Sequence, residues 1–192
     1  MLDSILLQAP KFLLIFVRCF ALISVIPMFS MRATSRVAKV ALAGYIAFFL
    51  LGTTDLSVYN QYLWDDGAFS LIFILIAIGE ALIGIIMGFY VSIIFAAFSA
   101  AGQFLAFQMG LSAASSYDSL SQVENPLMGQ FFNLVAMLVF MQTQWFQRLF
   151  FHGLDASFKT LNAVNIVMNQ EHIVKFMVSG LTSLFADAMV IA

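Results

Sequence analysis

Three ionisable residues lie inside otherwise apolar stretches of the sequence, namely Arg18, Glu80 and Asp187. A charge at membrane depth is costly and faces protein or water rather than lipid. Each of the three could therefore belong to an ion or proton pathway, or could pair with an opposite charge for structural reasons. Arg18 and Glu80 would form such a pair. Because three scattered charges make no recognisable proton relay, the structural role is favoured.

No set of catalytic or cofactor-binding residues can be assembled from the sequence. Cys19 is the single cysteine and lies in an apolar run without a neighbouring histidine, which favours an inert thiol. His152 and His172 have no Cys/His cluster around them, so no metal site is expected. The serines between Ser112 and Ser121 lack a base, and the sequence contains no Walker or HExxH pattern. We therefore expect a protein that is not an enzyme and that uses no cofactor or metal.

Small residues recur at every fourth position of the longest apolar stretch. Such residues let helix backbones approach closely in lipid, and positions four apart form one continuous ridge along a helix. The ridge could pack against helices of this chain or against another subunit, and both interpretations stay open. Its members are Gly84, Gly88, Ser92, Ala96 and Ala100, with Glu80 one turn before the first.

Composition indicates a membrane protein. Hydrophobic residues make up 62% of the chain and charged residues 9%. Soluble domains average roughly 45–50% hydrophobic and about 25% charged residues. So few charges cannot cover the surface of a soluble protein, so lipid or apolar protein must surround much of the chain. The net charge of −2 and the lack of a Lys/Arg run argue against a nucleic-acid partner.

Five apolar stretches predict an all-α fold, organised as a single helical membrane domain over residues 1–192. The stretches cover residues 12–29, 37–51, 68–109, 126–140 with an extension to 151, and 173–192. The stretch at 68–109 carries only one charge, and as a single helix it would reach roughly 60 Å. The hydrocarbon core of a bilayer is only about 30 Å thick. Either the helix breaks at Gly79-Glu80, or it runs beyond the bilayer and packs against partner subunits.

The connections between the stretches carry further signals. Residues 110–125 are rich in small and polar side chains, and Asn125-Pro126 predicts the end of a loop and the start of a helix. Phe104, Phe107 and Met109 lead into this loop, where bulky adaptable groups could seal a pore or simply face lipid or core. Before the long stretch, an aromatic cluster could form a membrane-interface belt or an ordinary packed loop. Its members are Tyr59, Tyr62 and Trp64.

Several blocks together resemble the FliR family, which supplies a membrane component of the flagellar type III export gate and is homologous to a component of virulence injectisomes. The most specific block is AGQFLAFQMGLS at residues 101–112, and EALIGIIMG at 80–88 precedes it. The resemblance covers about residues 10 to 160. Its remaining matches are Arg18, Pro27, Arg32, the run Arg36-Val37-Ala38-Lys39, Asp118, Asn125-Pro126 and the run LVAMLVF at 134–140.

The resemblance implies a subunit of a closed helical channel in the bacterial inner membrane, at the flagellar basal body. Its implied partners are FliP, FliQ and FlhB, besides membrane lipid, and unfolded flagellar proteins would pass through the channel. Residues 107–125 would then be a pore-plug loop that blocks the channel at rest and moves when substrate engages. The implied plug residues are Phe107, Met109, Gly110, Leu111, Ser112, Tyr117 and Asp118.

The chain also departs from the family pattern. Gln144-Trp145 stands where the family often has Gly-His, and Ser119 follows Asp118 where the family commonly has Pro. Family members continue for about two more helices, while this sequence stops inside an apolar run at Ala192, so we expect a C-terminally incomplete domain. The alternatives are the injectisome component and, from another class, a small secondary transporter or ion channel that uses the three intramembrane charges.

Overall fold

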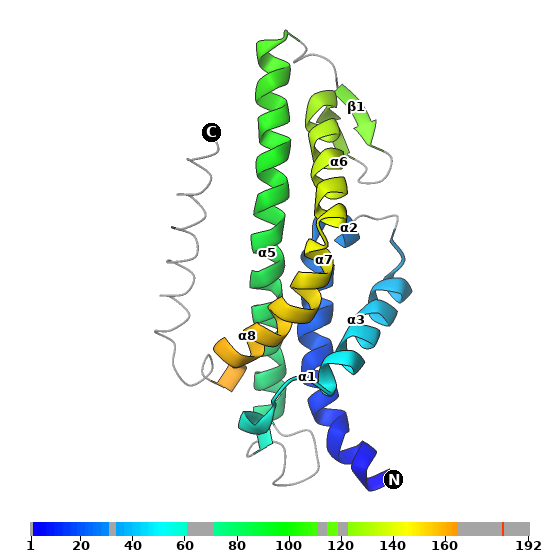
Figure 1. The fold of residues 1–192 in the computed structure, drawn as a ribbon, viewed down its shortest axis with the longest axis vertical. Helices are drawn as coiled ribbons and strands as arrows, with labels where there is room; N and C mark the ends of the chain where they lie inside the picture. Colours follow the sequence, from blue (N-terminus) through cyan, green and yellow to red (C-terminus); the bar gives the residue numbers. More distant parts are fainter. Residues whose placement is uncertain are drawn as a thin grey trace.

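A single long helix, α5 (Leu71–Gln108), forms the axis of the fold (Figure 1). The computed structural model describes residues 2–30, 34–60, 71–110, 115–118, 123–164 and 182. Helix α5 has 38 residues and therefore extends roughly 57 Å. It runs through Gly79-Glu80 without a break, which excludes the first of the two alternatives for the long apolar stretch. The predicted helix over about 68–109 is thus confirmed for residues 71–108.

The all-α fold class is confirmed, and the structure adds one short antiparallel strand pair. The fifth apolar stretch, apart from Thr182, and Asp187 lie outside the described residues. In chain order the other elements are α1 (Leu2–Val25), α2 (Pro27–Ser30), α3 (Arg36–Leu51), the 3-10 helix η1 (Ser57–Tyr59), β1 (Ser115–Asp118), β2 (Val123–Pro126), α6 (Leu127–Gln142), α7 (Trp145–Gln147), the π-helix η2 (Arg148–Gly153) and α8 (Leu154–Thr160).

Helices α1 and α6 pack along α5 at different heights, α1 on its lower half and α6 on its upper half (Figure 1). Glycines permit both contacts. A Cβ atom at Gly88 would lie 2.7 Å from the Cβ of Val25 in α1, and one at Gly102 would lie 2.6 Å from the carbonyl oxygen of Met128 in α6. Any larger residue would push the helices apart, since close-packed backbone cannot yield locally.

Helix α3 begins at an N-cap and packs on α1. The Ser35 hydroxyl oxygen accepts a hydrogen bond from the Ala38 amide at 3.2 Å, which satisfies one of the free donors of the first turn. One face of the helix is buried, through Ala43, Ile46, Ala47 and Leu50. The opposite face carries exposed apolar side chains, namely Val37, Val40, Tyr45, Phe48 and Phe49.

Helix α6 starts one residue later than expected. The sequence predicted an N-cap at Asn125 and a first helical residue at Pro126, but both belong to β2, where Pro126 pairs with Ser115. Helix α6 begins at Leu127. The strand pairing holds these two residues in extended backbone, so the helix can begin only after them.

The chain turns sharply after α6, and α8 then crosses the lower part of the molecule (Figure 1). Gln144 has φ 58°, a left-handed conformation that glycine adopts without steric cost. At this position the family that the sequence resembles often has Gly. The centre of the Phe146 ring, just after the turn, lies 4.5 Å from the centre of the Phe150 ring and 5.7 Å from the centre of the Phe29 ring in α2. These contacts hold the turn against the N-terminal helices.

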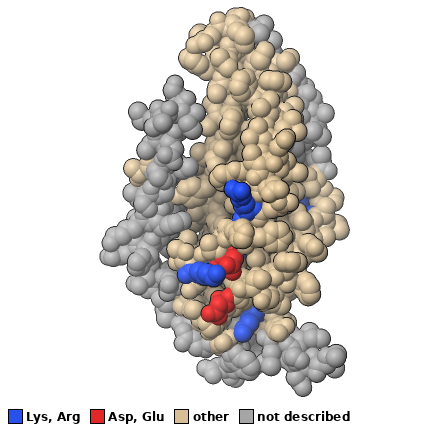
Figure 2. Space-filling view, in the orientation of Figure 1, with Lys and Arg blue, Asp and Glu red and all other residues tan. Residues whose placement is uncertain are grey.

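Charged side chains gather on one half of the molecule. Figure 2 shows Lys, Arg, Asp and Glu over the lower half, while the upper half formed by α5 and α6 shows none on this face. No Lys, Arg, Asp or Glu occurs in residues 81–117 or 125–147. Two helical segments, Gln8–Val25 and Leu71–Gln108, are long and apolar enough to cross a membrane. The surface is therefore suited to lipid and to apolar protein contacts.

The close approach of α1 and α5 gives a first prediction. Gly88→Ala should lower the free energy of unfolding by about 1–3 kcal/mol, because the added methyl overpacks a helix contact. Gly44→Ala is the matched control, since a Cβ there meets only the Phe16 ring at 4.0 Å and alanine favours the helix by roughly 0.5–1 kcal/mol. Denaturant unfolding in detergent would measure the free energy of unfolding of both variants. Equal changes in the two variants would contradict the close packing at Gly88.

Candidate functional site

The structure brings two of the three charges of the apolar stretches together in the centre of the lower half. Arg18 Nε of α1 donates to Glu80 Oε2 of α5 at 2.5 Å. Both side chains are 0% exposed. Each charge therefore finds its counter-charge inside the protein, which a buried ion requires.

The rest of the Arg18 guanidinium is held by the segment around α8. Nη1 donates to the Ser157 hydroxyl at 2.8 Å, and Nη2 donates to the Leu161 carbonyl oxygen at 2.9 Å. The guanidinium carbon lies 3.7 Å from the centre of the Phe158 ring, within the range of a cation–π contact. One arginine thus joins α1, α5 and α8.

The second carboxylate oxygen of Glu80 is also occupied. Glu80 Oε1 accepts from the Tyr59 hydroxyl at 2.5 Å and from the Ala163 amide at 3.4 Å. Burial, followed by the neighbouring Glu80 charge, raises the pKa of Tyr59, so the phenol stays protonated and remains a donor. Tyr59 is 1% exposed and is packed inside the protein, so it is not part of an interfacial aromatic belt. Tyr62 and Trp64 lie outside the described residues.

This arrangement, which we call the Arg18–Glu80 cluster (Arg18, Tyr59, Glu80, Ser157, Phe158, Leu161 and Ala163), fits a structural role better than transport. A transported ion or proton needs access from water, whereas the charged partners are fully buried and saturated with hydrogen bonds. Among the described residues no group of three or more His, Cys, Asp or Glu could hold a metal ion. The arrangement can fix helices relative to one another.

Several members of the cluster escaped the sequence analysis. Tyr59 was noticed only as part of an aromatic group, and Ser157 carries no local signal because its hydroxyl is one of many in the chain. Leu161 contributes a main-chain carbonyl oxygen and Ala163 a main-chain amide, so neither could be found from residue type. The usable signal was Arg18 itself, whose guanidinium has more hydrogen-bond donors than one carboxylate can satisfy.

The ridge of small residues divides into two parts. Gly84 lies against Arg18 and Ala21, and Gly88 against Leu22 and Val25, all in α1 of the same chain. The Ser92 hydroxyl donates to the Val25 carbonyl oxygen at 3.1 Å and to that of Gly88 at 3.0 Å. The remaining two members, Ala96 and Ala100, are exposed. The lower part of the ridge therefore packs inside the chain, and the upper part is open.

The segment expected to act as a plug follows directly on the end of α5. The side chain of Phe107 is 72% exposed, and Met109 is also exposed. Gly110 turns the chain with φ 71°. Strands β1 and β2 then form an antiparallel pair in which Tyr117 pairs with Glu124, and Asp118 with Val123. Leu111 and Ser112 lie outside the described residues.

Comparison with known proteins places this arrangement in a family. The family model described as "Bacterial export proteins, family 1" matches residues 9–192. The chain belongs to this family. Every member of the Arg18–Glu80 cluster, and every element described above apart from the first turns of α1, falls within the matched residues.

Named relatives support the same assignment. A flagellar biosynthetic protein FliR of Bacillus subtilis is 32% identical over 165 residues, which cover 84% of this chain and 59% of the relative. The FliR of Borreliella burgdorferi is 29% identical over 100% of this chain and 68% of the relative. The FliR of Escherichia coli is 33% identical over 65% of this chain and 45% of the relative. The resemblance to the FliR family is confirmed, and the chain spans about three fifths of the length of the Bacillus relative.

Variants of the ion pair separate a structural from a transporting role. Glu80→Gln should lower the free energy of unfolding by about 3–5 kcal/mol, because it leaves the Arg18 charge buried without its counter-charge. The double variant Arg18→Met/Glu80→Met should recover much of this loss, since it removes both charges. Unfolding in detergent and flagellar export in cells would be measured together. A stable double variant that exports nothing would contradict the structural role and favour a charge-dependent function.

Proposed function

We propose that the chain is a non-enzymatic subunit of the flagellar type III protein export gate, located in the bacterial inner membrane at the flagellar basal body. The match of an export-family model to residues 9–192 carries this proposal. The named relatives, all flagellar biosynthetic proteins, favour the flagellar system over the injectisome. In this proposal unfolded flagellar proteins pass through the channel that the assembled gate encloses.

The upper half of the molecule supports assembly with other subunits. Helix α5 is about twice as long as the hydrocarbon core is thick, so part of its apolar surface lies beyond lipid. Such surface stays out of water only against other protein. Neighbouring subunits of the FliP and FliQ type, with FlhB alongside, would cover it. Exposed apolar side chains of this half include Phe89, Ile94, Phe98, Phe104, Phe131, Leu134 and Leu138.

Residues 107–125 are proposed to close the channel at rest. The segment is attached at the far end of α5, where Gly110 turns the chain back toward α6. It carries a strand pair of only four residues on each side. An isolated two-stranded pair is marginally stable, so an arriving substrate can displace it without unfolding a helix. Phe107 and Met109 supply exposed apolar surface at its base.

Deletion of residues 110–122 should make the assembled gate leaky to small ions while assembly survives, because the Arg18–Glu80 cluster and the glycine contacts between α1 and α5 contain no residue of this segment. Conductance of the cell membrane and co-purification of the gate subunits measure the two effects. Replacement of the same residues by a Gly/Ser segment of equal length is the control for chain length, and it should leak as well. Unchanged conductance in both variants would rule out the plug.

The open part of the small-residue ridge gives a separate prediction about assembly. Ala100→Trp should reduce co-purification with the other gate subunits by about tenfold or more, because the bulky side chain prevents close helix approach. The unfolding midpoint of the chain alone should not change, since Ala100 is exposed. Ser99→Trp one position away, on the side near Gly129 of α6, should instead destabilise the chain alone. Normal co-purification of Ala100→Trp would exclude this surface as an interface.

A further inference from the structure

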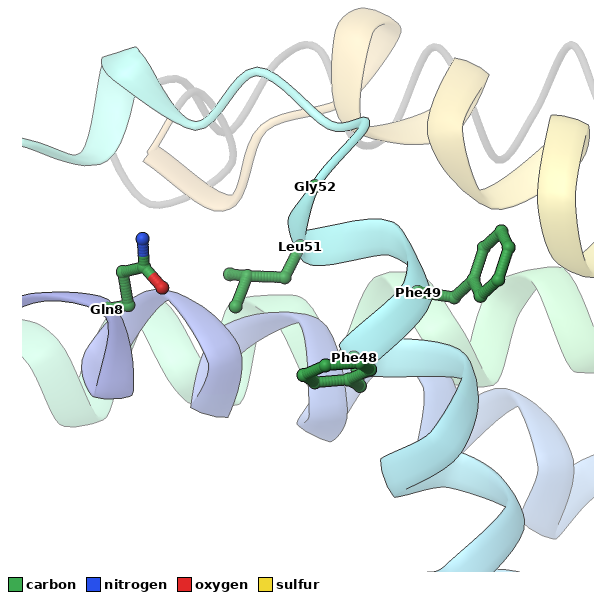
Figure 3. Close-up of a pocket in the computed structure, with 5 residues that line it drawn as sticks. All are labelled: Gln8, Phe48, Phe49, Leu51 and Gly52. Carbon is green, nitrogen blue, oxygen red and sulfur yellow. The ribbon is translucent and has the colours of Figure 1, made fainter. Parts of the chain in front are cut away.

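Two surfaces of the described chain differ in how sharply they define a partner, a cleft between α1 and α3 and the edge of the strand pair. The cleft is lined by Gln8, Phe48, Phe49, Leu51 and Gly52 (Figure 3). None of these residues is charged, and the Phe49 ring already packs edge-on against Phe151, with 5.4 Å between the ring centres. The cleft therefore selects no particular ligand. The strand edge does select, because free main-chain groups have fixed directions.

The register of the strand pair determines which main-chain groups are free. Opposite residues of an antiparallel pair alternate between those that exchange two hydrogen bonds and those that exchange none. Ser115 lies opposite Pro126, and proline has no N–H to donate, so these two residues exchange none. The hydrogen bonds therefore belong to the alternate pairs, Ser116–Asn125 and Asp118–Val123.

The remaining residues of the pair direct their main-chain groups outward. On the outer edge of β1, Ser115 and Tyr117 each present an N–H donor and a C=O acceptor. On the outer edge of β2, Glu124 presents both groups, but Pro126 presents only its C=O. The β1 edge can therefore pair along its whole length with another strand, whereas a proline interrupts the β2 edge.

The two edges also differ in their surroundings. Strand β2 packs beside α5 and α6, whereas β1 makes its extensive contact with β2 alone among the described elements. Figure 1 shows β1 beyond α6, on the side away from α5. No described main-chain group outside the pair bonds to Ser115 or Tyr117. Strand β1 also contains neither proline nor lysine, the residues with which proteins often prevent pairing at an exposed edge.

An exported protein has the chemistry that this edge requires. In the proposed function the chains that pass this segment are unfolded and differ in sequence, so no common pattern of side chains can be recognised. They do share an extended main chain, and hydrogen bonds from its N–H and C=O groups provide the affinity when a peptide adds to a sheet edge. A strand of four residues gives only a short ladder, so the contact is weak and lets the chain advance.

We propose that the outer edge of β1 binds the exported chain by strand addition, through the main-chain groups of Ser115 and Tyr117. This inference rests on the proposed function and adds to it the groups that recognise substrate. The segment that closes the channel at rest is then also the surface that the arriving chain pairs with. Recognition by main chain explains how one segment can accept many different sequences.

Disulfide trapping in the assembled gate tests the proposal. An exported protein fused to a folded domain stalls in the gate, and single cysteines are placed at consecutive positions of its stalled segment. Ser115→Cys should form disulfides with alternate positions only, because residues two apart share one face of a strand. Glu124→Cys is the matched control and should give about tenfold less, since β2 would lie roughly 9–10 Å from the added strand. The native thiol, Cys19, is buried and keeps the background low.

Removal of one main-chain donor gives a second measurement. In the Ser115→Cys chain, Tyr117→Pro should lower the disulfide yield about tenfold relative to Tyr117→Ala. Both substitutions remove the tyrosine side chain, but only proline removes the outward N–H. The N–H of Tyr117 is not used within the strand pair, so the pair itself should survive. Equal yields from the two variants would show that the main chain is not the recognised group and would overturn the proposal.

A further cysteine separates failure of this inference from failure of the proposed function. Phe107→Cys, at the exposed end of α5, should trap the stalled chain whether or not it pairs with β1. Trapping at Phe107→Cys with none at Ser115→Cys, or with trapping at consecutive positions, would refute strand addition and leave the proposed function standing. Disulfides from Ser115→Cys to a neighbouring gate subunit would instead make the edge an assembly contact and refute the inference. No trapping at either position would refute both.

Discussion

The buried ion pair between Arg18 and Glu80 is the constraint on which the lower half of the structure depends. Neither charge is tolerable in an apolar interior unless its remaining hydrogen-bonding groups are also satisfied. Satisfying them recruits the Tyr59 hydroxyl, the Ser157 hydroxyl and main-chain groups at Leu161 and Ala163. The positions of η1 and α8 follow from that demand. An apolar core alone would pack these helices, but it would not specify their register so strictly.

The molecule accordingly separates into two parts with different physical tasks. Its lower half holds the charges, the ion pair and the contacts of α1, α3 and α8. Its upper half consists of the part of α5 after Glu80 and of α6, two antiparallel helical segments without charged residues, with the strand pair at their end (Figure 1). A base fixed by an ion pair and an exposed apolar extension are consistent with the proposed role as a subunit of a larger assembly. Gly102 and Gly129 keep the extension thin, because they let its two helices touch through backbone.

Much of the fold was predictable because hydrophobic runs report helices directly. The long helix followed from an unbroken apolar stretch, and the pairing of Arg18 with Glu80 was one of two alternatives open from charge alone. The strand pair at 115–126 was missed, since Ser, Asn and Glu are poor strand formers and the pattern there favours a loop. The contacts of Leu161 and Ala163 were beyond reach, because main-chain partners leave no trace in residue type. The two uses of the small-residue ridge, inside the chain at Gly84 and open at Ala100, depend on where α1 ends.

The separation in sequence of the partners of Arg18 has a consequence for biosynthesis. Glu80 follows Arg18 by 62 residues and Ser157 by 139 residues. At translation rates of about 5–20 residues per second, the guanidinium waits roughly 3 to 12 seconds for its carboxylate and at least twice as long for α8. During that time the first helix carries an uncompensated cation, which costs roughly 2.5–3.5 kcal/mol at the centre of a helix in lipid. The first helix therefore reaches its full stability only after the later helices have been made.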